Sequence, residues 1–183
     1  RGNDSFTSIN LPRIGIEHGI CLGQRKEADW DGFYKELDEK LDMVADQLYQ
    51  RYKFQGSMRV RNFPFLMGQG NWMGSEKLGM DDTLESVIKH GTLSIGFIGL
   101  AETLVAMMGQ HHGESDEAQA KGLEIVKHMR EKCDDYKFNK YHLNYGLFAT
   151  PAEGLAGRFT RMDQKRYGKI KGVTDREYYT NSF

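Results

Sequence analysis

The chain has 183 residues, with 25 Lys and Arg against 26 Asp and Glu, and a formal net charge of -1. This balance excludes a basic nucleic-acid-binding module and an acidic disordered tail. Hydrophobic residues make up 39% of the chain, as in an ordinary globular protein. The sequence has neither an apolar run of ~18 residues, which a membrane span needs, nor a signal peptide at its start, so we expect a cytoplasmic protein without a membrane partner.

The first predicted element is a strand over residues 5–16, where apolar residues mix with Ser and Thr and Pro12 is expected to end or bend the strand. A loop follows, and then a long helix over residues 31–52. Apolar residues recur in this helix at helical spacing, which predicts one buried stripe. The stripe consists of Phe33, Leu37, Leu41, Val44 and Leu48.

Residues 58–82 are rich in Gly and aromatic residues and show no periodicity, which is typical of a long and often functional loop. A short helix is predicted over residues 83–90 and a buried strand over residues 92–98. Gly99 leads into the next helix, with Leu100, Leu104, Met107 and Met108 on one side.

A further helix begins at Ser115 or Asp116, and its predicted apolar stripe is Leu123, Val126, Met129 and Cys133. A second buried strand covers residues 143–149, and residues 173–183 resemble a loop with the start of a strand. Strands that alternate with helices indicate an α/β fold with a mainly parallel sheet. The two cysteines, Cys21 and Cys133, form no C-x-x-C motif, so we predict two free thiols in a reducing cytoplasm.

The strongest local motif is A-T-P-A-E-G at residues 149–154, directly after a predicted strand. Thr150 suits the N-cap of a helix, Pro151 the first helical position and Glu153 the third, which together form a capping box. A helix N-terminus beyond a strand can bind a phosphate through its free N–H groups. The alternative is a capped helix without a ligand, and a phosphate site requires the Glu153 carboxylate to turn outward.

Other motifs give weaker signals. Asn3, in the stretch R-G-N, can hold a sugar hydroxyl or a carboxylate, or it forms an Asx turn. The glycine-rich loop at residues 68–74 does not have the spacing of a dinucleotide fingerprint. His111, His112 and Glu114 lack a further ligand at useful spacing, so no metal site is predicted.

Five stretches together resemble one family, the anaerobic (class III) ribonucleoside-triphosphate reductases, and the match spans nearly the whole chain. They are R-G-N-D-S-F-T-S-I-N-L-P-R (1–13), N-F-P-F-L-M-G-Q-G-N-W-M-G (62–74), G-T-L-S-I-G-F-I-G-L-A-E (91–102), H-H-G-E-S (111–115) and A-T-P-A-E-G-L-A-G-R-F (149–159).

The resemblance implies a glycyl-radical oxidoreductase that makes deoxyribonucleotides for DNA replication. Its fold is a ten-stranded α/β barrel of two parallel halves, with helices flanking the strands. A cysteine thiyl radical removes the 3′-hydrogen of the ribose, the 2′-hydroxyl leaves as water, and formate or a thiol system supplies the reducing equivalents. An activase with an iron–sulfur cluster and S-adenosylmethionine installs the glycyl radical. The family also has a structural zinc and ATP and dNTP effectors. Because half a barrel exposes strand edges and an apolar inner face, we expect the chain to form a homodimer.

By this resemblance, residues 1–183 are expected to be a single central segment of the barrel. The nucleotide-binding cone, the loop of the radical cysteine, and the glycyl-radical and zinc region are expected outside the segment. The segment alone should therefore hold no cofactor and show no turnover. The resemblance makes Thr150, Pro151, Ala152, Glu153 and Gly154 the substrate-phosphate turn, and it makes Asn3 a contact to ribose or formate. Two alternatives remain, another glycyl-radical enzyme of the formate-lyase type and a non-catalytic interaction module.

Overall fold

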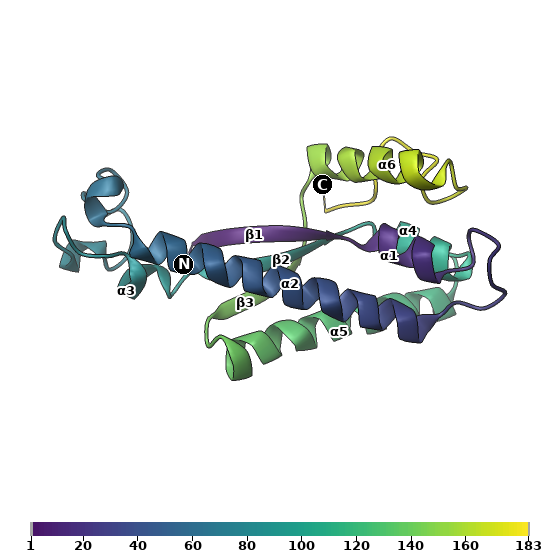
Figure 1. The fold of residues 1–183 in the computed structure, drawn as a ribbon, viewed down its shortest axis with the longest axis horizontal. Coiled ribbons are helices and arrows are strands. Elements are labelled where there is room, and N and C mark those ends of the chain that lie inside the picture. The colour runs from purple at the N-terminus through teal and green to yellow at the C-terminus, as the bar shows by residue number, and fades with distance from the viewer. Residues whose placement is uncertain (1, 183) are drawn as a thin grey trace. The chain divides into compact units, whose positions relative to one another are not determined.

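The computed structural model of this chain describes residues 2–182 (Figure 1). It contains two compact units. Unit 1 consists of Arg1–Thr7, Met43–Ile95 and Lys132–Gly146, and unit 2 of Ser8–Asp42, Gly96–Glu131 and Leu147–Phe183. Within the described residues, no helix combines the length and the apolar character that crossing a membrane requires.

A three-stranded sheet contains β1 (Asn3–Asn10), β2 (Thr92–Ile98) and β3 (Asn144–Ala149), in the order β1-β2-β3. The three strands run in the same direction (Figure 1). The buried side chains of β2 include Leu93, Ile95 and Ile98, as expected for a strand covered on both faces. The predicted α/β fold with a parallel sheet is confirmed.

The N-terminal strand is shorter than the sequence predicts. β1 ends at Asn10, and α1 (Leu11–His18) starts at once, so the strand prediction is wrong for residues 11–16. The Asn10 side chain caps this helix by accepting a hydrogen bond from the N–H of Arg13 (3.3 Å). Pro12 lies in the first helical turn, where its missing N–H costs nothing, so the proline helps to begin a helix.

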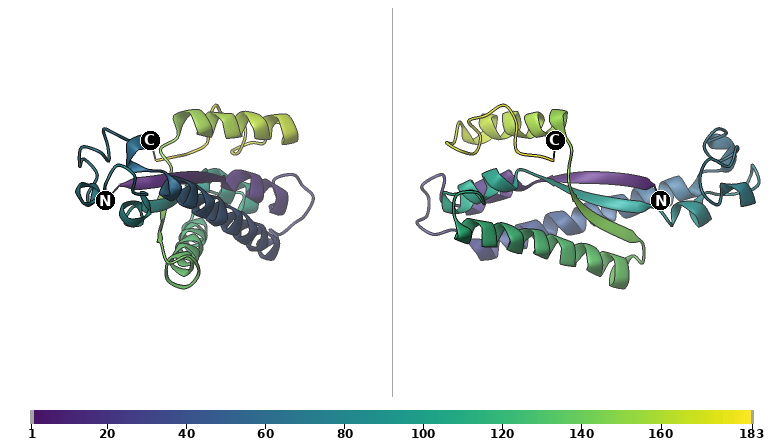
Figure 2. Two further views of the ribbon diagram at one scale, coloured as in Figure 1. Left: turned by 60° about the vertical axis from the view of Figure 1, so that its left-hand side comes forward. Right: turned by 180° about the vertical axis from the view of Figure 1, so that it is seen from behind.

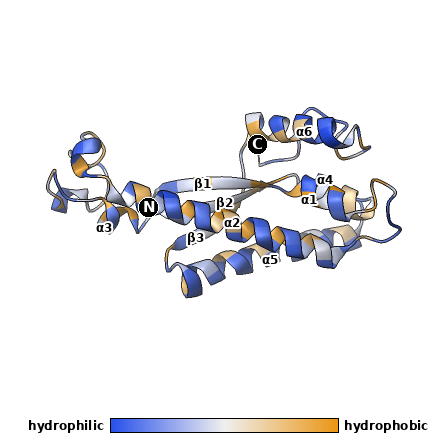
Figure 3. Cartoon of the chain, viewed as in Figure 1, coloured by the Kyte–Doolittle hydropathy of each residue, from blue (hydrophilic) through white to orange (hydrophobic). Residues whose placement is uncertain are grey.

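The long helix α2 spans Trp30–Ser57 and confirms the predicted helix, with one residue added at its start and five at its end. All five residues of its predicted apolar stripe are buried. Hydrophobic and hydrophilic residues alternate along α2, as expected of an amphipathic helix (Figure 3). The loop that follows has only two short turns, η1 (Val60–Asn62) and η2 (Ser75–Lys77), before α3 (Glu85–Ile88).

α4 (Leu100–Met108) follows Gly99, whose φ of 79° favours glycine. α5 (Asp116–Asp135) continues into a π-helical turn, η3 (Tyr136–Lys140). The predicted stripe of α5 is partly wrong, because Leu123 is 64% exposed. The stripe that is buried is shifted by one residue at this point, and its members are Ala118, Gly122, Ile125, Met129 and Cys133.

α6 (Glu153–Tyr167) follows β3, and the tail formed by residues 168–182 runs back beside it (Figure 2). The tail has no strand within its described residues, so the predicted strand start is wrong. The tail bonds instead to the residue that precedes α4, since the carbonyl of Thr180 accepts a hydrogen bond from the N–H of Gly99 (2.7 Å). Tyr179 packs in a core cluster with Ile98 and Ala156, which fixes the tail to α6.

Candidate functional site

Thr150 is held rigidly at the end of β3. Its side chain is buried, and its hydroxyl shares a hydrogen bond with the hydroxyl of Ser8 (2.7 Å). Its N–H donates to the carbonyl of Phe97 (3.1 Å), and its own carbonyl accepts from the N–H of Ser182 (3.3 Å). These contacts fix the backbone just before α6.

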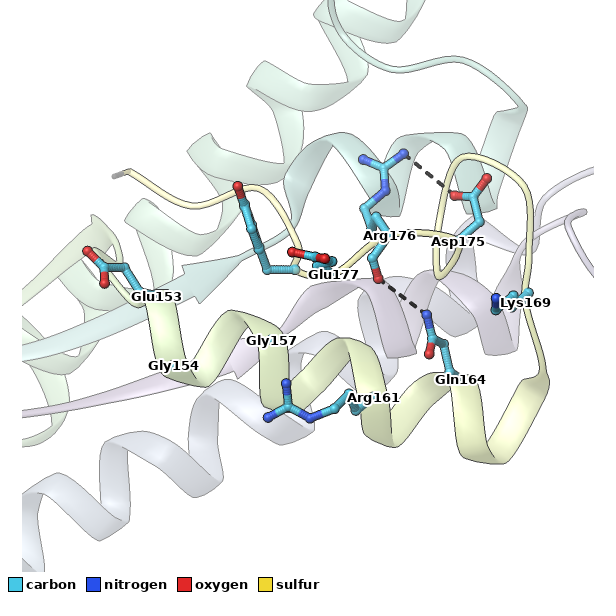
Figure 4. A pocket seen from close by; sticks show the side chains of 10 residues that line it. Glu153, Gly154, Gly157, Arg161, Gln164, Lys169, Asp175, Arg176 and Glu177 are labelled. Atoms are coloured by element: carbon cyan, nitrogen blue, oxygen red, sulfur yellow. Dashed lines mark hydrogen bonds and ion pairs between the residues drawn. The ribbon is translucent and has the colours of Figure 1, made fainter.

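The predicted capping box does not form. α6 begins at Glu153, its N-cap is Ala152, and no side chain caps it. Thr150 cannot act as the cap because it lies too early and its hydroxyl is engaged by Ser8. Glu153 therefore does not fold back onto a cap residue, and its side chain is exposed (Figure 4). A phosphate site at this position requires this outward orientation.

The first turn of α6 offers unused backbone donors. The first backbone bond of the helix joins the N–H of Ala156 to the carbonyl of Ala152 (2.9 Å). The N–H groups of Glu153, Gly154 and Leu155 precede it, so the helix supplies them with no acceptor. A Cβ built on Gly154 would meet no atom within 4 Å, which shows that the backbone is accessible there. Such a turn can bind an anion through N–H groups and the helix dipole.

A pocket of about 660 Å³ extends from this turn along α6 and beneath the tail (Figure 4). Gly154 is exposed at the start of α6, Gly157 is buried farther along the same side, and Arg161 lies one turn beyond Gly157. Lys169 lines the far end, and the carboxylates of Glu153 and Glu177 also border the pocket. The lining of the pocket therefore contains both the backbone N–H donors of the first turn and the basic side chain of Arg161.

A buried carboxylate holds the opposite side of α6. Asp163 is fully buried and accepts hydrogen bonds from the side chains of Asn10 (2.9 Å), Arg13 (2.8 Å) and Tyr179 (2.7 Å). Burial raises the pKa of Tyr179 well above its ordinary value, and the bond to Asp163 adds to this effect, so the phenol stays a neutral donor. α6 is thereby tied to the end of β1 and to the tail.

A second buried carboxylate holds the tail. Glu102 of α4 is fully buried and accepts hydrogen bonds from Arg176 (2.6 Å) and from the hydroxyl (2.8 Å) and N–H (3.2 Å) of Thr180. Sequence reasoning misses both Asp163 and Glu102. The available signal for Glu102 is an acidic residue within the apolar helix L-A-E-T-L.

Asn3, the other predicted site residue, opens β1 in unit 1, whereas residues 150–154 belong to unit 2. Its side chain is exposed. With its amide nitrogen facing the sheet, it donates to the carbonyls of Thr92 (2.8 Å) and Ser5 (3.0 Å). The amide oxygen then remains as the acceptor for another group. Arg1 of the same R-G-N stretch lies outside the described residues.

The structure also places the other polar candidates. His111 Nε2 lies 3.7 Å from the Glu114 carboxylate on the surface. A different group, Glu17, His18 and Glu36, has its potential ligand atoms within 4.8 Å of one another. Here His18 Nε2 already hydrogen-bonds to Glu36 (2.8 Å). No sequence pattern indicates this group, because the predicted strand ends at residue 16 and the helix that brings Glu17 and His18 toward Glu36 is not predicted.

The prediction that the two cysteines are not joined in a disulfide is confirmed for Cys21 and Cys133. Cys133 is buried, and burial raises the pKa of the Cys21 thiol.

Comparison with known proteins gives one consistent result. The anaerobic ribonucleoside-triphosphate reductase of Salmonella typhimurium is 35% identical over 186 residues, which cover 100% of this chain and 25% of that protein. The reductase of Enterobacteria phage T4 is 28% identical, covering 100% of this chain and 28% of the relative. The chain thus spans about a quarter of the length of these curated relatives.

Solved structures show the same fold. The anaerobic ribonucleotide reductase of Thermotoga maritima with dATP bound in the specificity site matches with a TM-score of 0.69 and 16% identity, over 97% of this chain and 27% of that one. The complex of that enzyme with dATP and CTP matches with a TM-score of 0.66 and 17% identity, over 97% of this chain and 26% of that one. The family model described as anaerobic ribonucleoside-triphosphate reductase matches residues 1–183. The chain belongs to the anaerobic ribonucleoside-triphosphate reductase family.

Proposed function

We propose that the chain is part of an enzyme that reduces ribonucleoside triphosphates to 2′-deoxyribonucleoside triphosphates. Its share of the work is to form part of the catalytic barrel and to bind the substrate phosphates at residues 150–154. The observation that carries this proposal is the accessible start of α6, where three N–H groups lack a helical acceptor and Glu153 is turned outward.

Each residue of the turn has a separate role in this proposal. Thr150, fixed by Ser8 and Phe97, sets the direction in which the chain enters α6. Pro151 and Ala152 bring the chain into the helix. The N–H groups of Glu153 and Gly154 then donate to phosphate oxygens, and the absence of a side chain at Gly154 lets the phosphate approach the backbone.

The proposed enzyme also needs a zinc ion and a glycyl radical. A four-cysteine zinc site does not fit the residues of this chain, since the chain has only two cysteines, one of them buried. The glycyl radical, once installed by an activase with an iron–sulfur cluster and S-adenosylmethionine, would supply the radical that generates the hydrogen-abstracting cysteine thiyl. We propose Asn3 as a contact to ribose or formate, through the amide oxygen that the sheet leaves unused. The proposal also includes ATP and dNTPs as effectors of the enzyme and a homodimer as its assembly.

The phosphate turn is tested by recording the amide NMR spectrum of the ¹⁵N-labelled chain during a titration with CTP. We expect saturable shifts at residues 153–155 and none of comparable size with cytidine, because cytidine has no phosphate. A Gly154→Pro variant removes one N–H donor near the start of the helix, where proline is tolerated, and should weaken the response. If CTP leaves residues 153–155 unchanged, the turn is not a phosphate site and the proposed function fails.

A further inference from the structure

Arg161 lies on the pocket face of α6. Gly154, Gly157 and Arg161 follow one another at spacings of three and four residues, so they share one side of the helix. The side chain of Arg161 folds back toward the start of the helix, as Figure 4 shows. Its Nη1 lies 3.2 Å from the position that a Cβ on Gly157 would occupy.

This guanidinium differs from two arginines of unit 2 that hold α6 and the tail in place. Arg13 is paired with Asp163 (2.8 Å) and Arg176 with Glu102 (2.6 Å). Within residues 2–182, Arg161 has neither an ion pair nor a hydrogen bond from its guanidinium. A delocalised cation with five N–H donors therefore faces the pocket without an acceptor.

The distance from the backbone donors suits a chain of phosphates. Gly154 and Gly157 are separated by about 4.5 Å along the helix axis. From a phosphate bound at the N–H groups of Glu153 and Gly154, the next phosphates would extend along the pocket toward the guanidinium, which lies close to Gly157. Lys169, the other unpaired cation of the pocket, lies beyond the end of α6, ~20 Å along the axis from Glu153, and is too far to bind the same chain.

The acidic residues of the pocket would repel a chain of phosphates unless a cation offset their charge. Glu153 and Glu177 border the pocket near its start, and each added phosphate increases the repulsion from their carboxylates. A triphosphate that reaches farther along α6 needs a positive partner at the next turn, and Arg161 lies there.

We propose that Arg161 binds the terminal phosphates of the substrate and makes the site selective for nucleoside triphosphates over diphosphates and monophosphates. This inference rests on the proposed function, since it assumes that the first phosphate occupies the start of α6.

The test compares Arg161→Gln with Arg158→Gln, a matched control that removes an exposed arginine of the same helix outside the pocket lining. Affinities for CTP, CDP and CMP are measured from amide shifts at residues 153–155. We expect Arg161→Gln to weaken CTP binding about tenfold and CMP binding less than twofold, because a charge-assisted hydrogen bond is lost with the triphosphate alone. Arg158→Gln should leave the ratio of the two affinities unchanged.

The outcomes separate the two proposals. If the wild-type chain shows no CTP response at residues 153–155, the proposed function fails, and this inference fails with it. If CTP binds there but Arg161→Gln weakens CTP and CMP equally, or neither, only the role of Arg161 is refuted. Arg161→Lys separates the effect of the bidentate guanidinium geometry from that of the positive charge, since lysine keeps the charge and loses the planar pair of N–H donors. Full CTP selectivity in Arg161→Lys would show that charge at this position suffices, and selectivity lower than that of the wild type would show that the guanidinium geometry contributes.

Discussion

The two sides of α6 use charged residues in opposite ways. On the buried side, Asp163 accepts hydrogen bonds from three side chains. On the pocket side, Arg161 has no partner among the described residues. A buried charge must be fully hydrogen-bonded because removing it from water costs several kcal/mol, whereas an exposed charge keeps its hydration and stays available for a ligand. The buried side therefore fixes the helix, and the open side is free to bind.

The largest expected effect comes from breaking the buried side. Asp163→Ala leaves the donors of Asn10, Arg13 and Tyr179 without their acceptor and should lower the free energy of unfolding by about 3–5 kcal/mol. Urea unfolding of the chain measures this loss. Lys165→Ala, which removes an exposed charge from the same helix, serves as the control and should change stability by less than about 0.5 kcal/mol. Equal losses in the two variants would contradict the structural role of Asp163.

A substitution on the open side should separate stability from binding. Gly154→Ala meets no atom within 4 Å, and alanine favours a helix more than glycine does, so the variant should gain about 0.5 kcal/mol of stability. The new Cβ leans toward the helix start, where the phosphate approaches the backbone, and should weaken CTP binding about tenfold. Thermal unfolding and the CTP titration test the two effects in one variant. Unchanged CTP affinity would show that the ligand does not contact this backbone.

The sequence predicts the parts of this site that depend on neighbouring residues. The apolar stripe of α2 and the two buried strands appear in the pattern, because their burial follows from local periodicity. A helix directly after β3 is also predicted, since strand and helix signals adjoin there, but it begins at Glu153 and not at Pro151 as the motif predicts. The details depend on contacts far apart in sequence. Thr150 fails as a cap because its hydroxyl meets Ser8, 142 positions earlier, and no local pattern encodes that contact.

The same limit applies to α1 and to the buried carboxylates. Ile14 and Ile16 suit a strand as well as a helix, and the Asn10 cap decides for the helix. Asp163 is 150 positions from its partner Arg13, so its sequence neighbours give no sign that it is buried. A polar residue within a helix indicates a surface position unless a distant partner is known.

The comparison between partnered and unpartnered charges extends to unit 1, where Asp4 is a partly buried carboxylate. No described residue donates a hydrogen bond to its side chain, which packs against Gly91. Burial raises the pKa of Asp4 from 3.8 to about 6. Between about pH 4 and pH 6 the folded chain therefore binds more protons at this position than the unfolded chain, and the free energy of unfolding falls as the pH rises through that window.

Asp4→Asn replaces the carboxylate with a neutral group of the same shape. The free energy of unfolding of the variant should therefore not fall as the pH rises from 4 to 6. We expect the variant to be more stable than the wild type by about 1 kcal/mol above pH 6, a value reduced from the full shift because water still reaches part of the side chain. Below about pH 4 the wild-type carboxyl is itself neutral, and the two stabilities should converge. Thermal unfolding from pH 4 to pH 8 measures the difference. A difference that stays constant over this range would mean that the carboxylate of Asp4 is stabilised by a donor in the way that Asp163 is, and that burial alone does not set its pKa.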